Sequence, residues 1–268
     1  MSPMNNRLLV PRKTPGLLDL VPGAAAAYSL RSLSNSYADP VVTVRRSSDD
    51  AEEDFTAAEV ADGTLAAFAG AGDAFVKQWW DQSGNARHAS QSTANYQPSV
   101  VSAGSVRLLD GKPAIYFSSN MLSFQGIVGV NQASIFILAN NTKPTSMDGG
   151  AGCWLGYSLS PHLYLQHTQT DFKFAYASLL TTPITDVTSA TLGSFVGNAS
   201  TKAAYTNGAL GGTGGAVSFS ADKIGSYAQY TGGPYTAYGM MQELIIYPSD
   251  LTAQRELIEG NIAWSYSV

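Results

Sequence analysis

Short apolar runs separated by turn-forming residues recur along most of this 268-residue chain. The runs at residues 41–45 and 74–80 are typical of half-buried strands, because they are brief and rich in β-branched or aromatic side chains. Asn207-Gly208 predicts a tight hairpin, since both residues accept the positive φ that a two-residue turn requires. Further strands are expected at residues 114–117, 135–139, 163–165, 172–176, 192–196, 217–219 and 240–247. The pattern predicts a mainly β fold, an antiparallel sandwich.

Two segments follow helical spacing instead. Leu30, Leu33 and Tyr37 recur at positions that share one face of a short helix. Residues 257–266 repeat apolar side chains at the same spacing, with Thr252 as the expected N-cap, so the chain should close with a helix. The sandwich is therefore expected to carry short peripheral helices.

Residues 1–23 are expected to form an extended, Pro-rich N-terminal arm, followed by the sandwich domain at residues 24–268. Proline removes a backbone donor and holds the chain extended. Leucines and valines between the prolines give this arm more apolar surface than a free tail should leave in water. We expect the arm to pack either along its own domain or on a neighbouring subunit or host particle, and we expect the chain to form a homo-oligomer.

Composition and charge narrow the classes of partner. Charged residues are only 13% of the chain and the net charge is −5, so there is no polycation for a nucleic-acid backbone. No stretch is long and apolar enough to span a membrane, and the first 13 residues lack the apolar run of a secretory signal. We therefore expect no nucleic-acid partner, no membrane span and synthesis in a cytoplasm without a signal peptide.

The residues that could bind metals or react are few and scattered. Cys153 is the single cysteine, so an intrachain disulfide is excluded and a buried, inert thiol is expected. The acidic segment 47–54 does not match a calcium loop, and a solvated loop is the simpler interpretation. The three histidines, His88, His162 and His167, are not completed by a zinc-ligand pattern. We predict no metal and no cofactor.

Three separated segments resemble a known family. Residues Ala27–Phe55, Phe75–Ala89 and Gly239–Tyr266 are similar, in order and spacing, to the catalytic domain of arabinofuranosidase B enzymes. The closing strand and helix also resemble laminin G-like jelly rolls. Both resemblances imply a concanavalin A-like antiparallel β-sandwich. The first two segments are similar as well to bacteriophage and prophage proteins in which such a domain follows a Pro-rich arm, which implies a virion or tail component.

The resemblance also implies what an enzyme would need. The family is retaining and uses two carboxylates roughly 5–5.5 Å apart. Its nucleophilic Glu lies downstream of a vicinal Cys pair, but here Cys153 is followed by Trp154, and residues 162–171 contain no Glu. Its acid/base Asp follows an Ile-Gly-Gly sequence, whereas residues 224–227 read Ile-Gly-Ser-Tyr. Asp171 is the one nearby replacement, so the prediction leans toward a protein without catalytic residues.

The remaining prediction is carbohydrate binding, because aromatic rings and fixed hydrogen-bonding groups are what recognise sugars. The leading function is a non-catalytic virion or tail structural protein with a lectin-like domain for host surface glycans. Its arm would contact other virion proteins. The alternatives are an arabinofuranosidase-like glycoside hydrolase and a bacterial extracellular adhesion module. The candidate carbohydrate-binding residues are Trp154, His162, Tyr164, Tyr227 and Tyr230.

Overall fold

The structure, a computed structural model, describes residues 14–143, 146, 152–158, 164–168, 170–176, 178–226 and 236–266. Side chains are described throughout these ranges except at residues 164–166, 175–176 and 178–179. Within them the chain is mostly antiparallel strands with short helices, as the sequence predicts. No helix in these ranges is long and apolar enough to cross a membrane.

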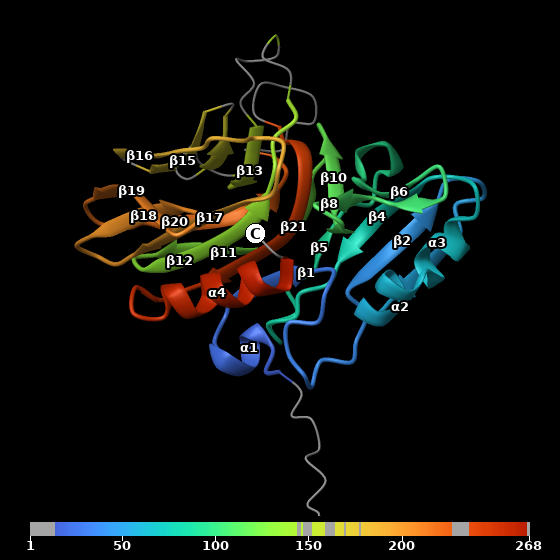
Figure 1. Ribbon diagram of the computed structural model, residues 1–268, viewed down its shortest axis with the longest axis horizontal. Helices are drawn as coiled ribbons and strands as arrows, with labels where there is room; N and C mark the ends of the chain where they lie inside the picture. Colours follow the sequence, from blue (N-terminus) through green and yellow to red (C-terminus); the bar gives the residue numbers. More distant parts are fainter. Residues whose placement is uncertain are drawn as a thin grey trace, which may run out of the picture.

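Nineteen of the described strands form one sheet that curls into two facing layers (Figure 1). Layer A runs, in order of pairing, through β3 (Glu52–Phe55), β2 (Val42–Arg46), β4 (Ala74–Trp79), β6 (Ser99–Ser102), β10 (Ile115–Ser118), β21 (Tyr238–Tyr247), β12 (Ala133–Ala139), β17 (Thr191–Gly197), β18 (Lys202–Thr206) and β19 (Ala209–Gly214). Layer B runs through β5 (Ala89–Ser90), β11 (Leu122–Val130), β20 (Phe219–Ile224), β13 (Gly152–Gly156), β14 (Tyr164–His167), β15 (Asp171–Tyr176) and β16 (Ser178–Pro183). Because β5 also pairs with β4, it joins the two layers.

Shorter elements decorate this frame. The strand β1 (Ala26–Ser29) pairs with the half of β21 that β10 leaves open. The remaining elements are β7 (Ser105–Val106), the β8 (Leu108–Leu109) and β9 (Lys112–Pro113) pair, the helices α1 (Leu17–Leu20), α2 (Ala57–Asp62), α3 (Thr64–Ala69) and α4 (Arg255–Tyr266), and the 3₁₀ turn η1 (Ala94–Tyr96).

An inner core fills the space between the layers. Ile135 and Phe195 from layer A are buried there with Phe174 and Phe219 from layer B. The rings of Phe174 and Phe195 stack with centroids 5.5 Å apart, which fixes the layers face to face. Burying each such side chain stabilises the fold by about 1.5–3 kcal/mol.

An outer core lies on the opposite face of layer A, beneath α4 and α1. Side chains alternate along a strand, so Phe136 of β12 points to this outer core whereas its neighbour Ile135 points inward. Ile258 and Ile262 of α4 pack in the same cluster. Strands buried on both faces explain why residues 135–139 are continuously apolar instead of alternating.

The start of the described chain belongs to this outer core. Leu17 and Val21 are buried, and Leu17–Leu20 forms the helix α1. The prediction of an extended arm up to residue 23 is therefore wrong over these residues. The helix is stabilised because Asp19 accepts the Gly16 N–H at 2.8 Å and Leu18 donates its N–H to the Leu33 carbonyl at 2.8 Å. Residues 1–13 lie outside the described part, so their packing stays a prediction.

The predicted helix over Leu30–Tyr37 is also wrong, because this segment is an irregular loop after β1. The buried side chain of Gln82 takes over the hydrogen bonds that a helix would make. Its amide donates to the carbonyls of Ser29 and Arg31 and accepts the N–H of Leu33. Once its backbone groups are paired in this way, a buried loop needs no regular structure.

The hairpin and the closing helix are confirmed. Asn207 and Gly208 have φ of 47° and 79° at the turn between β18 and β19. Helix α4 covers the whole predicted segment, residues 257–266. Thr252 does not cap it, because its hydroxyl donates to Asp250 at 2.6 Å in the preceding turn.

Candidate functional site

A polar groove of about 560 Å³ opens on the part of layer A formed by β2, β4, β6 and β10. It is built by one row of cross-strand neighbours, in which Arg45 pairs with Phe75, Phe75 with Ser99, and Ser99 with Tyr116. Residues directly opposite each other in antiparallel strands share a face. Four adjacent strands span roughly 14 Å at the usual spacing, which is room for a short chain of rings.

The row faces outward because its neighbours face the core. Val44 and Val76 are buried in the inner core, so Arg45 and Phe75, one residue along, point to the opposite face. Ile115 and Phe117 flank the half-buried Tyr116 in the same way. The groove thus follows directly from strand periodicity.

Two arginines lie over the aromatic rings of the groove. The guanidinium carbon of Arg45 is 5.2 Å from the Phe75 ring centroid, and that of Arg107 is 4.6 Å from the Tyr116 centroid. Such cation–π contacts contribute about 0.5–1 kcal/mol at exposed sites. Both arginines are therefore held in place, and their conformation is fixed before any ligand arrives.

Hydrogen bonds hold the polar lining of the groove. The buried Gln97 accepts from Arg45 Nε at 2.8 Å and donates to the Gln91 carbonyl at 2.9 Å. Asn120 accepts the Ser118 N–H at 2.8 Å. The exposed Asn95 and the carboxylate of Asp73, which accepts the Ala103 N–H, complete the lining. Half-buried rings beside a few fixed polar groups are typical of small-molecule sites.

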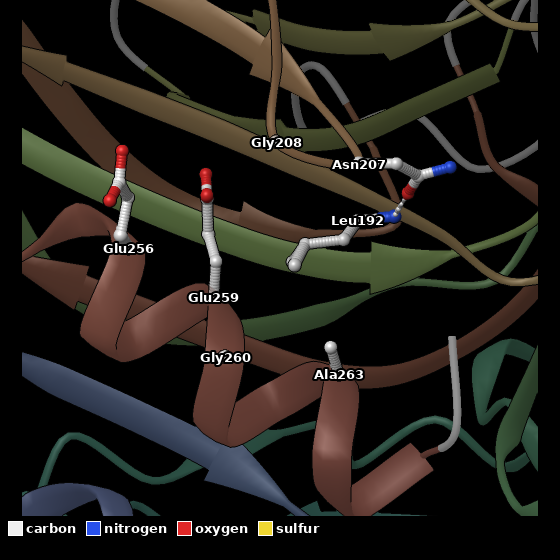
Figure 2. Close-up of a pocket in the computed structure, with 7 residues that line it drawn as sticks. All are labelled: Leu192, Asn207, Gly208, Glu256, Glu259, Gly260 and Ala263. Carbon is white, nitrogen blue, oxygen red and sulfur yellow. Dashed lines mark hydrogen bonds between the residues drawn. The ribbon is translucent and has the colours of Figure 1, made fainter.

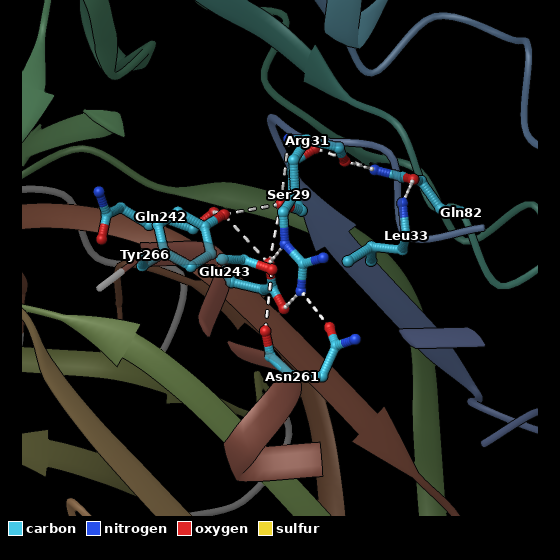
Figure 3. Close-up of polar contacts among 9 residues, drawn as sticks. Ser29, Arg31, Leu33, Gln82, Gln242, Glu243, Asn261 and Tyr266 are labelled. Atoms are coloured by element: carbon cyan, nitrogen blue, oxygen red, sulfur yellow. Dashed lines mark hydrogen bonds and ion pairs between the residues drawn. The ribbon is translucent and has the colours of Figure 1, made fainter. Parts of the chain in front are cut away.

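Glu243, the first carboxylate after the position matched to the family's acid/base, is a buried structural residue (Figure 3). Arg31 binds it through Nε at 2.8 Å and Nη2 at 2.9 Å, and Ser29 and Tyr266 donate hydroxyls at 3.0 and 3.1 Å. Burial and the Glu243 charge raise the pKa of Tyr266 well above its usual value, so its hydroxyl stays protonated as a donor. The network ties β1, β21 and α4 together.

Two further carboxylates line a pocket of about 390 Å³ between α4 and the β18–β19 turn (Figure 2). Glu256 and Glu259 project from α4 on the side that faces Gly208. Arg255 binds Glu259 through Nη1 and Glu256 through Nη2 at 2.9 Å, and its guanidinium lies 3.9 Å from the Tyr205 centroid. One arginine thus compensates both carboxylates.

The structure describes the side chain of only one of the predicted carbohydrate contacts, Trp154. Trp154 on β13 is fully buried and meets Phe117 edge-on, with ring centroids 5.6 Å apart, so neither ring face is open to a sugar. Tyr164 lies on β14, but its side chain is outside the described part. His162, Tyr227 and Tyr230 are also outside it. Sequence reasoning missed the groove residues; the only signal for its central row is an outward position in an alternating strand.

The other reactive residue types are buried or bonded locally. Cys153 is buried, as predicted, and burial raises the pKa of its thiol to about 12. His167 is buried and stacks on Phe172 at 4.3 Å, and burial lowers its pKa to about 3. Asp171 accepts the Thr170 hydroxyl at 2.7 Å at the start of β15. Among the described residues, no three His, Cys, Asp or Glu side chains gather as a metal site would require.

Comparison with known proteins gives structural relatives only. No protein-family model matches the chain, and no curated protein does. An arabinofuranosidase complexed with arabinofuranosyl-α-1,2-xylobiose is similar with a TM-score of 0.60 and 17% identity, over 89% of this chain and 62% of that one. A GH54 α-L-arabinofuranosidase soaked with a cyclic sulfate inhibitor is similar with a TM-score of 0.59, at the same identity and coverage.

The chain therefore spans about three fifths of the length of these arabinofuranosidases. At this identity the likeness shows the fold, and it confirms the predicted concanavalin A-like antiparallel β-sandwich. What a domain of this fold does depends on its own side chains.

Proposed function

We propose that this chain is a non-catalytic carbohydrate-binding domain and that the polar groove on β2, β4, β6 and β10 is its binding surface. The observation that carries the proposal is the outward row of Arg45, Phe75, Ser99 and Tyr116, in which rings and fixed polar groups lie side by side. Sugars present apolar C–H faces between hydroxyls, and such a lining complements both.

The carboxylates support binding without hydrolysis. A retaining glycosidase needs one ionised nucleophile and one carboxyl group that carries a proton. Glu243 is bound by Arg31, while Glu256 and Glu259 share Arg255. Each of these carboxylates is already bound by an arginine of the fold, which is the role of a structural residue.

Purified protein should accordingly release no arabinose from aryl arabinofuranosides above the rate in buffer. Chromogenic release followed over hours at several pH values measures this. Turnover that is lost on replacing a single Asp or Glu would make the domain a hydrolase.

We also propose that the domain works as a virion or tail component and meets glycans on the host surface. The support is the resemblance of Ala27–Phe55 and Phe75–Ala89 to phage proteins and the Pro-rich start of the chain, where Leu8, Leu9 and Val10 lie between prolines. One shallow site should bind at roughly millimolar Kd, because association and side-chain ordering consume most of the contact energy. Display of many copies would raise the apparent affinity by about 10² to 10⁴. Mass spectrometry of purified particles tests whether the chain is present in them.

The binding surface is tested by retention on immobilised host polysaccharides. Tyr116→Ala should weaken retention by about fivefold or more, the factor that corresponds to losing ~1 kcal/mol. Tyr205→Ala is the matched control, because Tyr205 also lies under an arginine, Arg255, but outside the groove. Equal retention of wild type and both variants would remove the groove as the binding surface.

A further inference from the structure

Arg107 is a cation that the described protein does not neutralise. Its Nε donates to Ser99 Oγ at 2.8 Å and its guanidinium lies over Tyr116. None of the described carboxylates lies within ion-pairing distance of it, whereas Arg45 in the same groove is paired with Asp50 at 2.6 Å. None of the described carboxylates therefore pairs with the two terminal amino groups of Arg107, which lines the groove.

We propose that the groove selects sugars that carry a carboxylate and that Arg107 binds this carboxylate through its two terminal amino groups. This inference rests on the proposed carbohydrate-binding function and names the ligand class. A planar guanidinium matches the two oxygens of a carboxylate with parallel hydrogen bonds, which a lysine ammonium cannot reproduce.

The contacts of Arg107 prepare it for this role. Ser99 and Tyr116 hold the guanidinium, so little conformational freedom is lost when a ligand arrives. A free arginine at the surface would lose more side-chain entropy for the same two bonds. The fixed orientation is what separates a binding arginine from a solvated one.

The rest of the lining fits the neutral part of an acidic sugar. Asp73 and Asn95 offer acceptors for hydroxyl groups, and Phe75 offers an apolar ring. Asp73 is negative, so a doubly charged phosphate would meet more repulsion than a singly charged carboxylate. A sugar acid places one charge at Arg107 and leaves only hydroxyls for the remaining groove.

The test compares ligands that differ only in charge. The full chain is titrated with an oligosaccharide of uronic acids and with its methyl ester, which has the same backbone without the charges. Wild-type protein should bind the acid about tenfold or more tightly, because charge-assisted pairs are the stronger hydrogen bonds. Binding of the acid should weaken as salt is raised, while that of the ester should not.

Variants test whether Arg107 is the residue that recognises the charge of the ligand. Arg107→Gln should abolish the preference for the acid, and Arg107→Lys should restore only part of it because the fork is lost. Arg46→Gln is the matched control and should keep the preference, because Arg46 also lies over an aromatic ring, that of Phe68, but is paired with Asp49 and does not line the groove. Circular dichroism checks that each variant is folded. If Arg107→Gln does not fold, the binding of acid and ester to the wild-type protein still tests whether the groove selects a carboxylate.

The outcomes separate the two proposals. Equal binding of acid and ester, both lost in Tyr116→Ala, would overturn the carboxylate inference and keep the carbohydrate site. Equal or tighter binding of a sulfated oligosaccharide would also overturn it in favour of a general anion site. Absence of binding to any glycan, including host polysaccharide, would overturn the proposed function and with it the inference.

Discussion

Removing Arg31 should be among the most destabilising changes on the surface of this protein, because it would leave a buried charge alone. Glu243 is fully buried, and the side chain of Arg31 is only 23% exposed. Arg31→Met would delete both charged contacts to Glu243 and the 3.1 Å hydrogen bond to Asn261. Breaking a buried pair from one side typically costs 3–5 kcal/mol.

The remaining donors set where in that range the cost should fall. Ser29 and Tyr266 still give Glu243 two hydrogen bonds, at 3.0 and 3.1 Å, so we expect about 3 kcal/mol. Replacing both partners, Arg31→Met with Glu243→Met, should cost less than Arg31→Met alone, since no uncompensated charge remains.

Urea unfolding followed by circular dichroism measures these free energies, with the double-mutant cycle giving the coupling between the two residues. Arg255→Met is a useful comparison for Arg31→Met, because Arg255 pairs with two carboxylates. The side chain of Glu256 is 87% exposed, whereas Glu259 is buried. A loss below about 1 kcal/mol for Arg31→Met, or additive effects in the cycle, would refute the view that this network is a buried ion pair that fixes β1 and β21.

Two further predictions concern pH and the start of the chain. Burial lowers the pKa of His167 to about 3, so below pH 6.5 the unfolded state binds more protons than the folded state, and the unfolding free energy should decrease by up to about 1.4 kcal/mol for each unit by which the pH is lowered. Urea titrations between pH 7.5 and 5 measure this slope, which His167→Phe should remove. An unchanged slope in the variant would contradict the assignment to His167. Deleting residues 1–13 should leave the urea unfolding midpoint nearly unchanged. Deleting residues 1–22 removes Leu17 and Val21 from the outer core and should lower the unfolding free energy by about 3–6 kcal/mol in the same assay. Equal stability of the two truncated proteins would contradict the packing of Leu17 and Val21 in this core.

The strands could be predicted because their signals are local. Residues 41–45 carry β-branched side chains, and Asn207 and Gly208 both accept the positive φ values that a two-residue turn needs. The loop at Leu30–Tyr37 could not be predicted from its own residues. Gln82, which lies 49 residues from Leu33, supplies the hydrogen bonds that replace those of a helix. A tertiary contact of this kind overrides a spacing pattern.

The groove escaped prediction for a related reason. Arg45, Phe75, Ser99 and Tyr116 occupy four separate segments, and each is an ordinary outward position of its strand. Only the register of β2, β4, β6 and β10 brings them into one row. The family resemblance directed attention instead to residues 153–171 and 224–230, where it implied the carboxylates of an enzyme.

The groove and the region that the resemblance indicated nevertheless meet at one turn. Ser119 bonds to Thr236 at 3.1 Å and to the Tyr238 hydroxyl at 2.7 Å, while its neighbour Asn120 lines the groove. Gly225 has a φ of 84°, and a Cβ there would lie 2.6 Å from the Asn120 carbonyl, so only glycine allows this approach. Tyr227 follows two residues later in the chain. Under the proposed function, a glycan longer than the groove would therefore leave it at this turn, next to Gly225, in the segment where the resemblance predicted the acid/base carboxylate of an enzyme.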